Sequence, residues 1–143
     1  MNKIQVRDLM RFSANFVSKN NTLFYAFEAM KKSCFGEILV VNQDFSILGN
    51  IEKDTIKSAL KVQLNDNIAA MKKTKLNELD IDYSFPVVLY PKMEIEEAYS
   101  LMSYMSKKYL PVVSAPWDKK VIGFLWISDL VKTLDKNTIK ITG

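Results

Sequence analysis

The run VIGFLWISDL, residues 121–130, decides how the rest of this sequence is interpreted. Its first half is rich in branched and aromatic residues, which is typical of a strand, and Gly123 interrupts that strand where other backbone can approach closely. Ser128 and Asp129 then stand where a helix is capped, just before Leu130. The run therefore predicts a strand that leads into a helix, with a polar corner suited to a ligand.

A related run, ILGNIEKDTI, lies at residues 47–56 and has the same order of apolar residues, glycine and aspartate. The likeness extends outward from both runs. Four residues with the i, i+3, i+4, i+7 spacing of an amphipathic helix recur 72 positions later: Leu23, Ala26, Phe27 and Met30, then Ile95, Ala98, Tyr99 and Met102. An internal repeat therefore organises the chain.

Each half is predicted to contain a strand, a helix, two strands and a second helix. In the first half the strands are residues 15–18, 38–41 and 47–51, with helices from Leu23 and over residues 54–62. In the second half the strands are residues 85–89, 110–113 and 121–125, with a turn at 114–120 and a last helix starting near Ser128. Pro111 favours a position at a strand edge or end. The fold class is α+β.

The predicted division of the chain follows from the repeat. Residues 1–62 form the first repeat with an N-terminal entry segment, residues 63–84 form a helical connector, and residues 85–137 form the second repeat. Inside the connector, residues 76–79 resemble residues 6–9 of the entry segment in spacing and polarity.

Composition excludes several classes of function. The chain has 143 residues, of which 48% are hydrophobic and 25% charged, as in an ordinary globular domain. No apolar run is long enough to span a bilayer, and the polar start does not resemble a signal peptide. Cys34 is the single cysteine, so an internal disulfide is excluded and a cytoplasmic location is favoured. Histidine is absent, which argues against an enzyme and against a metal site.

The net charge of +4 comes with lysines in pairs rather than in long runs. Paired lysines are typical of solvated helix ends and turns, although they also attract phosphates. Nucleic-acid binding would need a clustered basic face, so nucleic acid is not favoured as a partner.

The repeat resembles the CBS domain, a small module named after cystathionine beta-synthase, and two in tandem resemble a Bateman module. The second copy carries the better match, at residues 109–113 and 123–129; in the first copy the corresponding residues are 37–41 and 49–54. The resemblance implies two β-α-β-β-α repeats with pseudo-twofold symmetry, sheets packed together, helices outside and a cleft between the repeats. It also implies a homodimer.

The resemblance further implies a non-catalytic, regulatory function. Such modules bind AMP, ADP, ATP or S-adenosylmethionine as a regulatory ligand, with no required cofactor, and pass a conformational change to a partner protein. The alternative is a degenerate pair that serves as a dimerisation or protein-docking scaffold and binds no nucleotide.

Site residues are implied position by position. Asp129 in the second copy and Asp54 in the first stand at the place of the family's ribose-binding aspartate, with Ser128 and Lys53 beside them at positions that could reach a phosphate. The base-contacting positions are Phe85, Pro86, Val87, Tyr109, Leu110 and Pro111 in the second copy, and Phe16, Val17, Ile38 and Leu39 in the first.

Both copies depart from the family pattern before the aspartate, and the first copy is also one residue short between Gly49 and Asp54. The family has a Ser or Thr three residues before the aspartate, where this chain has Ile51 and Trp126. Trp126 could stack on a base or fill the cleft, and Asp129 could equally satisfy free N–H groups in the first turn of its helix. These departures support the scaffold alternative.

Overall fold

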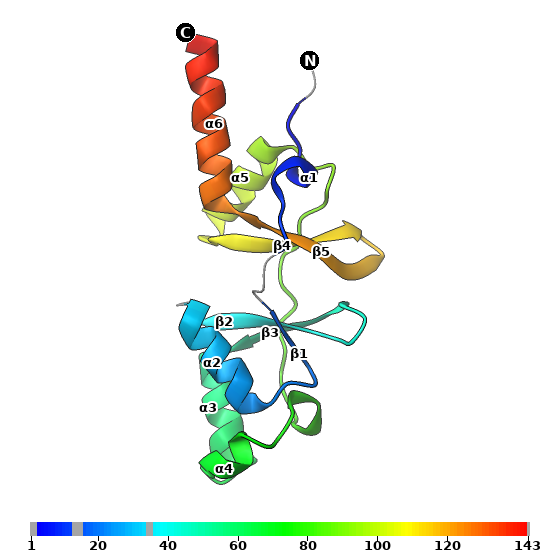
Figure 1. Ribbon diagram of the computed structural model, residues 1–143, viewed down its shortest axis with the longest axis vertical. Helices are drawn as coiled ribbons and strands as arrows, with labels where there is room; N and C mark the ends of the chain where they lie inside the picture. The colour runs from blue at the N-terminus through cyan, green and yellow to red at the C-terminus, as the bar shows by residue number, and fades with distance from the viewer. Residues whose placement is uncertain (1–2, 13–15, 34–35, 143) are drawn as a thin grey trace. The chain divides into compact units, whose positions relative to one another are not determined.

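The computed structural model describes residues 3–12, 16–33 and 36–142, with the backbone alone described at residue 33 and over residues 137–142. The chain divides into two compact units (Figure 1). We call Ala14–Pro86 the first unit, and Met1–Ser13 together with Val87–Gly143 the second unit. Cys34, expected to be a buried apolar side chain, lies outside the described residues.

The first unit is a three-stranded sheet with its helices on one side (Figure 1). Its elements are β1 (Phe16–Ser18), α2 (Leu23–Ser33), β2 (Glu37–Val41), β3 (Ile47–Glu52), α3 (Lys53–Val62), α4 (Ile68–Met71) and a 3-10 turn, η1 (Leu76–Glu78). The central strand β2 runs parallel to β1 and antiparallel to β3. The hydroxyl of Thr22 accepts a hydrogen bond from the amide of Tyr25 at 3.1 Å, which caps α2 as predicted.

The second unit contains α1 (Val6–Leu9), α5 (Ile95–Tyr104), β4 (Tyr109–Ala115), β5 (Asp118–Trp126) and α6 (Ile127–Thr142). Strands β4 and β5 form an antiparallel hairpin, and α5 and α6 lie on one side of it (Figure 1). Its core is apolar and includes one residue from the N-terminal segment: Val6, Leu89, Ile95, Ala98, Met102, Leu110, Val112, Leu125 and Leu130. The α+β class is therefore confirmed.

Strand register confirms the internal repeat. Val17 is paired with Val40 in the first unit, and Leu89 is paired with Val112 in the second, both shifted by 72 residues. The next pairs are Val40 with Gly49 and Val112 with Gly123, and the register shifts directly after each of these pairs. The repeat thus extends to the positions of the β-bulges, which sequence spacing alone did not reveal.

The entry segments are exchanged between the two halves of the sequence. The amide of Val6 donates to the carbonyl oxygen of Met93 at 2.8 Å, and in the same way the amide of Leu76 donates to the carbonyl oxygen of Asn21 at 2.9 Å. Each entry segment therefore pairs with the helical start of the other repeat. The two compact units therefore do not coincide with the sequence repeats, whose predicted boundaries lie at residues 62 and 85.

The predicted strand at residues 85–89 is wrong, because Leu89 alone in this stretch forms a β-bridge. Leu89 donates to the carbonyl oxygen of Pro111 at 2.9 Å and accepts from the amide of Val113 at 3.0 Å. The next carbonyl along this parallel ladder, that of Val87, would need the N–H that Pro111 lacks. The edge position predicted for Pro111 is confirmed. Because Pro111 has no N–H to donate, the pairing of residues 85–89 with β4 does not extend beyond Leu89.

Three smaller expectations are also corrected. The turn at residues 114–120 is shorter, since the strands continue to Ala115 and resume at Asp118, whose carboxylate accepts a hydrogen bond from the hydroxyl of Ser114 at 2.7 Å. Helix α6 begins at Ile127, near Ser128 as predicted, but Ser128 and Asp129 lie inside its first turn and not at the capping position before it. Tyr99, placed by its spacing on the apolar face of α5, has 37% of its surface exposed.

Candidate functional site

The β5–α6 corner of the second unit brings together Tyr109, Trp126 and Asp129. Tyr109 opens β4 and is the cross-strand partner of Trp126, the last residue of β5. Their ring centroids are 4.8 Å apart with planes inclined by 35°. Tyr109 also forms an edge-to-face pair with Phe124, with ring centroids 6.0 Å apart. Asp129 follows in the first turn of α6, where free N–H groups and the helix dipole favour negative charge.

Arg11 completes this corner, and sequence reasoning missed it. Its Nε lies 3.4 Å from a carboxylate oxygen of Asp129, and its guanidinium carbon lies 5.4 Å from the centroid of the Trp126 ring. Two backbone hydrogen bonds with Phe124, of 2.9 and 2.7 Å, hold Arg11 beside β5. No local motif marks Arg11, because it reaches the corner only through the exchange of entry segments.

The Arg11–Asp129 ion pair leaves the corner accessible. The side chains of Arg11 and Asp129 are 58% and 31% exposed. An ion pair in such contact with water contributes little to stability, roughly 0–1 kcal/mol. A ligand that offers hydrogen-bond donors to Asp129 can therefore compete with Arg11 at small cost.

The other residues predicted for the second copy lie in different surroundings. Leu110 and Pro111 are buried, and Leu110 belongs to the apolar core, so their side chains face away from solvent. Ser128 is exposed. Val87 is half-buried in the second unit, whereas Phe85 and Pro86 belong to the first unit. The predicted set is thus divided between the two units.

In the first copy, the β3–α3 corner has no ring pair of this kind among its described residues. Lys53 and Asp54 are exposed at the start of α3, and Ile51 is fully buried in the core, where the family pattern has a hydroxyl. Val17 and Ile38 also belong to the core. Leu39 is buried, and Phe16 packs edge-on against Phe45 with centroids 5.8 Å apart.

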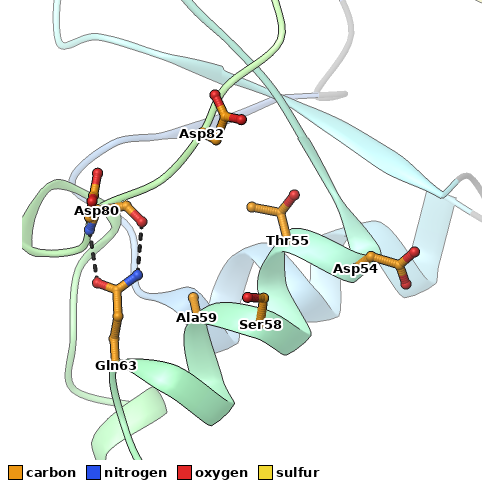
Figure 2. A pocket seen from close by; sticks show the side chains of 7 residues that line it. All are labelled: Asp54, Thr55, Ser58, Ala59, Gln63, Asp80 and Asp82. Carbon is orange, nitrogen blue, oxygen red and sulfur yellow. Dashed lines mark hydrogen bonds between the residues drawn. The ribbon is translucent and has the colours of Figure 1, made fainter.

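A pocket of about 300 Å³ lies beside Asp54. Figure 2 shows Thr55 and Ser58 of α3 directed into it and Asp82 above them. The side-chain amide of Gln63 closes one end, because it donates to the carbonyl oxygen of Asp80 at 2.8 Å and accepts from the amide of Asp80 at 2.9 Å. Three of the lining residues are aspartates, and none is lysine or arginine. The pocket is lined by Asp54, Thr55, Ser58, Ala59, Gln63, Asp80 and Asp82.

The described part of the chain shows neither a metal-binding cluster nor a membrane-spanning helix. No group of three acidic, cysteine or histidine side chains there is placed to hold a metal ion. Of the helices described, none has the length and apolar content needed to cross a lipid bilayer.

Comparison with known proteins gives matches among solved structures. Neither a protein-family model nor a curated protein sequence matches the chain. The structure of AcuB from Vibrio cholerae is similar with a TM-score of 0.64 and 20% identity, covering 99% of this chain and 96% of that one. That of CBSX2, a CBS-pair protein of Arabidopsis thaliana, in complex with AMP has a TM-score of 0.63 and 20% identity, covering 94% and 98%.

A third similar structure is the CBS domain pair of protein MJ0100 with 5'-methylthioadenosine and S-adenosylmethionine. Its TM-score is 0.58 with 16% identity, and the match covers 95% of this chain and 99% of that one. At these identities the similarity concerns the fold. The chain has the fold of a tandem CBS-domain pair, as the repeat predicted.

Proposed function

We propose that this chain is a non-catalytic regulatory module that binds an adenine-containing ligand at the β5–α6 corner. The observation that carries the proposal is the meeting of Trp126, Tyr109 and Asp129 at one strand-to-helix corner. The fold supports it too, because similar CBS pairs have been solved with AMP and with S-adenosylmethionine.

Each group of the corner has a chemical task in this proposal. The carboxylate of Asp129 accepts hydrogen bonds from the two ribose hydroxyls. The base stacks on the indole of Trp126 in place of the Arg11 guanidinium, and Tyr109 holds the indole from the neighbouring strand. No proton transfer or bond cleavage is involved, so ligand binding is the whole chemical event.

The regulatory step in the proposal is a population shift. We expect the chain to act as a homodimer in the cytoplasm, and a bound ligand to favour one dimer geometry over another. The shift can be no larger than the difference in ligand affinity between the two geometries. The signal would then pass to a partner protein.

A scaffold without nucleotide is the second candidate function. Two observations favour it: Ile51 is buried where a ligand-binding hydroxyl is expected, and Asp129 is already engaged by Arg11. Under this reading, the corner is a closed structural contact and the dimer itself is the functional unit.

Thermal unfolding with a ligand panel separates the two candidates. The panel contains AMP, ADP, ATP, 5'-methylthioadenosine and S-adenosylmethionine. A ligand at about 100 times its dissociation constant stabilises the folded state by about 2.7 kcal/mol, which raises the midpoint by several degrees. The variant Asp129→Asn should lose this rise. Asp135→Asn, an exposed carboxylate of the same helix, should keep it.

The outcomes are distinct. If no ligand at millimolar concentration raises the midpoint, the sensor is refuted and the scaffold remains. If a rise survives in Asp129→Asn, the sensor stands but the β5–α6 corner is not its site.

A further inference from the structure

We infer that Arg11 selects phosphate-bearing ligands at the β5–α6 corner, and that the β3–α3 corner excludes them. The inference rests on the proposed function and adds to it the chemical class of ligand and a specificity-determining residue. It arises from the exchange of entry segments, which delivers a different charge to each corner.

The guanidinium of Arg11 is placed to bind a phosphate as well as Asp129. Its Nε lies 3.4 Å from a carboxylate oxygen of Asp129, and its terminal nitrogens donate no hydrogen bond among the described residues. A guanidinium carries five N–H donors in a fixed plane, so the donors turned away from Asp129 can bind phosphate oxygens. More than half of the side chain is exposed, which leaves room for a ligand group.

Trp126 restricts where Arg11 can go. The guanidinium lies over the indole at 5.4 Å from the ring centroid, a cation–π distance. Two backbone hydrogen bonds to Phe124 fix the main chain of Arg11. The positive charge is therefore held close to the surfaces proposed for base and ribose, where a 5'-phosphate would lie.

Without Arg11, the β5–α6 corner would repel a nucleotide. Asp129 carries a negative charge beside the place where the phosphate must lie, and like charges close together disfavour binding. The Arg11–Asp129 pair makes the corner nearly neutral. When the ribose hydroxyls donate hydrogen bonds to Asp129, the guanidinium is released and can form charge-assisted hydrogen bonds with the phosphate.

The pocket beside the β3–α3 corner is acidic instead, and Lys53, which precedes Asp54 in α3, does not line it. Its exchanged segment brings Asp80 and Asp82 to the pocket that Asp54 also lines (Figure 2). None of the residues that line this pocket is basic. In both copies the exchanged segment runs beside the last strand, since Ser84 pairs with Asn50 as Arg11 pairs with Phe124. The same architecture therefore admits an anion at one corner and repels it at the other.

Titration calorimetry with AMP and adenosine tests the inference, because these ligands differ only in the phosphate. The whole chain is compared with Arg11→Gln, with Arg11→Lys, and with Arg7→Gln, which removes an exposed charge from the same segment. We expect one AMP per chain. Arg11→Gln should weaken AMP about tenfold and change adenosine by less than about twofold. Arg11→Lys should recover part of the loss, and Arg7→Gln should change neither ligand.

Each result decides something. An unchanged ratio of AMP to adenosine affinity in Arg11→Gln, with the fold intact by circular dichroism, overturns the inference, as do two equivalent AMP sites per chain. In both cases adenosine binding that depends on Asp129 leaves the proposed function standing. If neither ligand binds the wild-type chain, the proposed function fails and the inference falls with it.

Discussion

The amide of Val6 hydrogen-bonds to the carbonyl oxygen of Met93 at 2.8 Å, and the side chain of Val6 is fully buried in the core of the second unit. The N-terminal segment is therefore part of the core of the second repeat. Val6→Ala should lower the free energy of unfolding by roughly 2 kcal/mol, because two methyl groups are lost from a packed core.

Denaturant unfolding measures this loss, with Arg7→Ala as the control. Arg7 is the next residue and its side chain is exposed, so its replacement should change stability by less than about 0.5 kcal/mol. Equal effects of the two substitutions would mean that the segment does not belong to the core.

The two repeat-equivalent glycines should respond differently to alanine. Gly49 has φ of +148°, and a Cβ there would lie 2.6 Å from the Cβ of Tyr83 and 3.1 Å from the carbonyl oxygen of Ser84. Gly49→Ala should therefore cost roughly 2–4 kcal/mol. At Gly123 the nearest atoms are Cγ and Sδ of Met10, both at 3.3 Å. Because that flexible side chain can move, Gly123→Ala should stay within about 1 kcal/mol of wild type.

Thermal and denaturant midpoints of both variants provide the measurement. The sequence repeat alone predicts equal costs, since the two glycines hold the same place in it. A Gly123→Ala variant that is destabilised as strongly as Gly49→Ala would contradict the structural explanation.

Tyr83 should make the chain less stable in strong alkali. Burial raises the pKa of the Tyr83 phenol to about 12 from its ordinary value of 10.0. Since the folded-state pKa is the higher one, the contribution to stability is complete below pH 10. It is lost as the pH rises from about 10 to about 12, because the unfolded chain releases the proton first.

Replacement of the hydroxyl tests this alkaline dependence. The Tyr83 oxygen is buried and has no hydrogen-bond partner among the described residues, so Tyr83→Phe should leave stability at pH 7 unchanged or raised. The variant should lose the tyrosinate absorbance that develops last, near pH 12. Tyr104→Phe, at a side chain that is 90% exposed, should retain it.

Trp126 should report ligand binding by fluorescence. The chain has two tryptophans, and Trp117 is 87% exposed on the β4–β5 turn. In a Trp117→Phe background, emission comes from Trp126 alone, and an adenine stacked on its ring should quench that emission. The quench should saturate with ligand and be absent in Asp129→Asn. Ligand binding that leaves Trp126 emission unchanged would place the adenine elsewhere.

Local patterns in the sequence were sufficient to predict most of the helices and strands. The spacing of Leu23, Ala26 and Met30 predicts the buried face of α2, and these residues are buried. The 72-residue offset predicts the repeat, which strand register confirms. The buried face of a helix depends on neighbours within that helix, so periodicity reveals it, and the repeat is visible as the same spacing found twice along the chain.

What the sequence did not reveal depends on contacts between distant segments. Residues 85–89 have the apolar character of a strand, yet Pro111, more than twenty residues away, removes the N–H that would extend it. Arg11 has no motif of its own and meets Asp129 only because the entry segments are exchanged. At the candidate site, sequence therefore predicted Asp129, Trp126 and Tyr109 but could not supply the counter-charge.

The reciprocal pairing of Val6 with Met93 and of Leu76 with Asn21 leaves neither half of the chain with a complete core. Val6 belongs to the core of the second unit, and Leu76, which follows the first repeat in sequence, belongs to the core of the first unit. A cut between the repeats at residue 62 would therefore separate both residues from the cores that they complete.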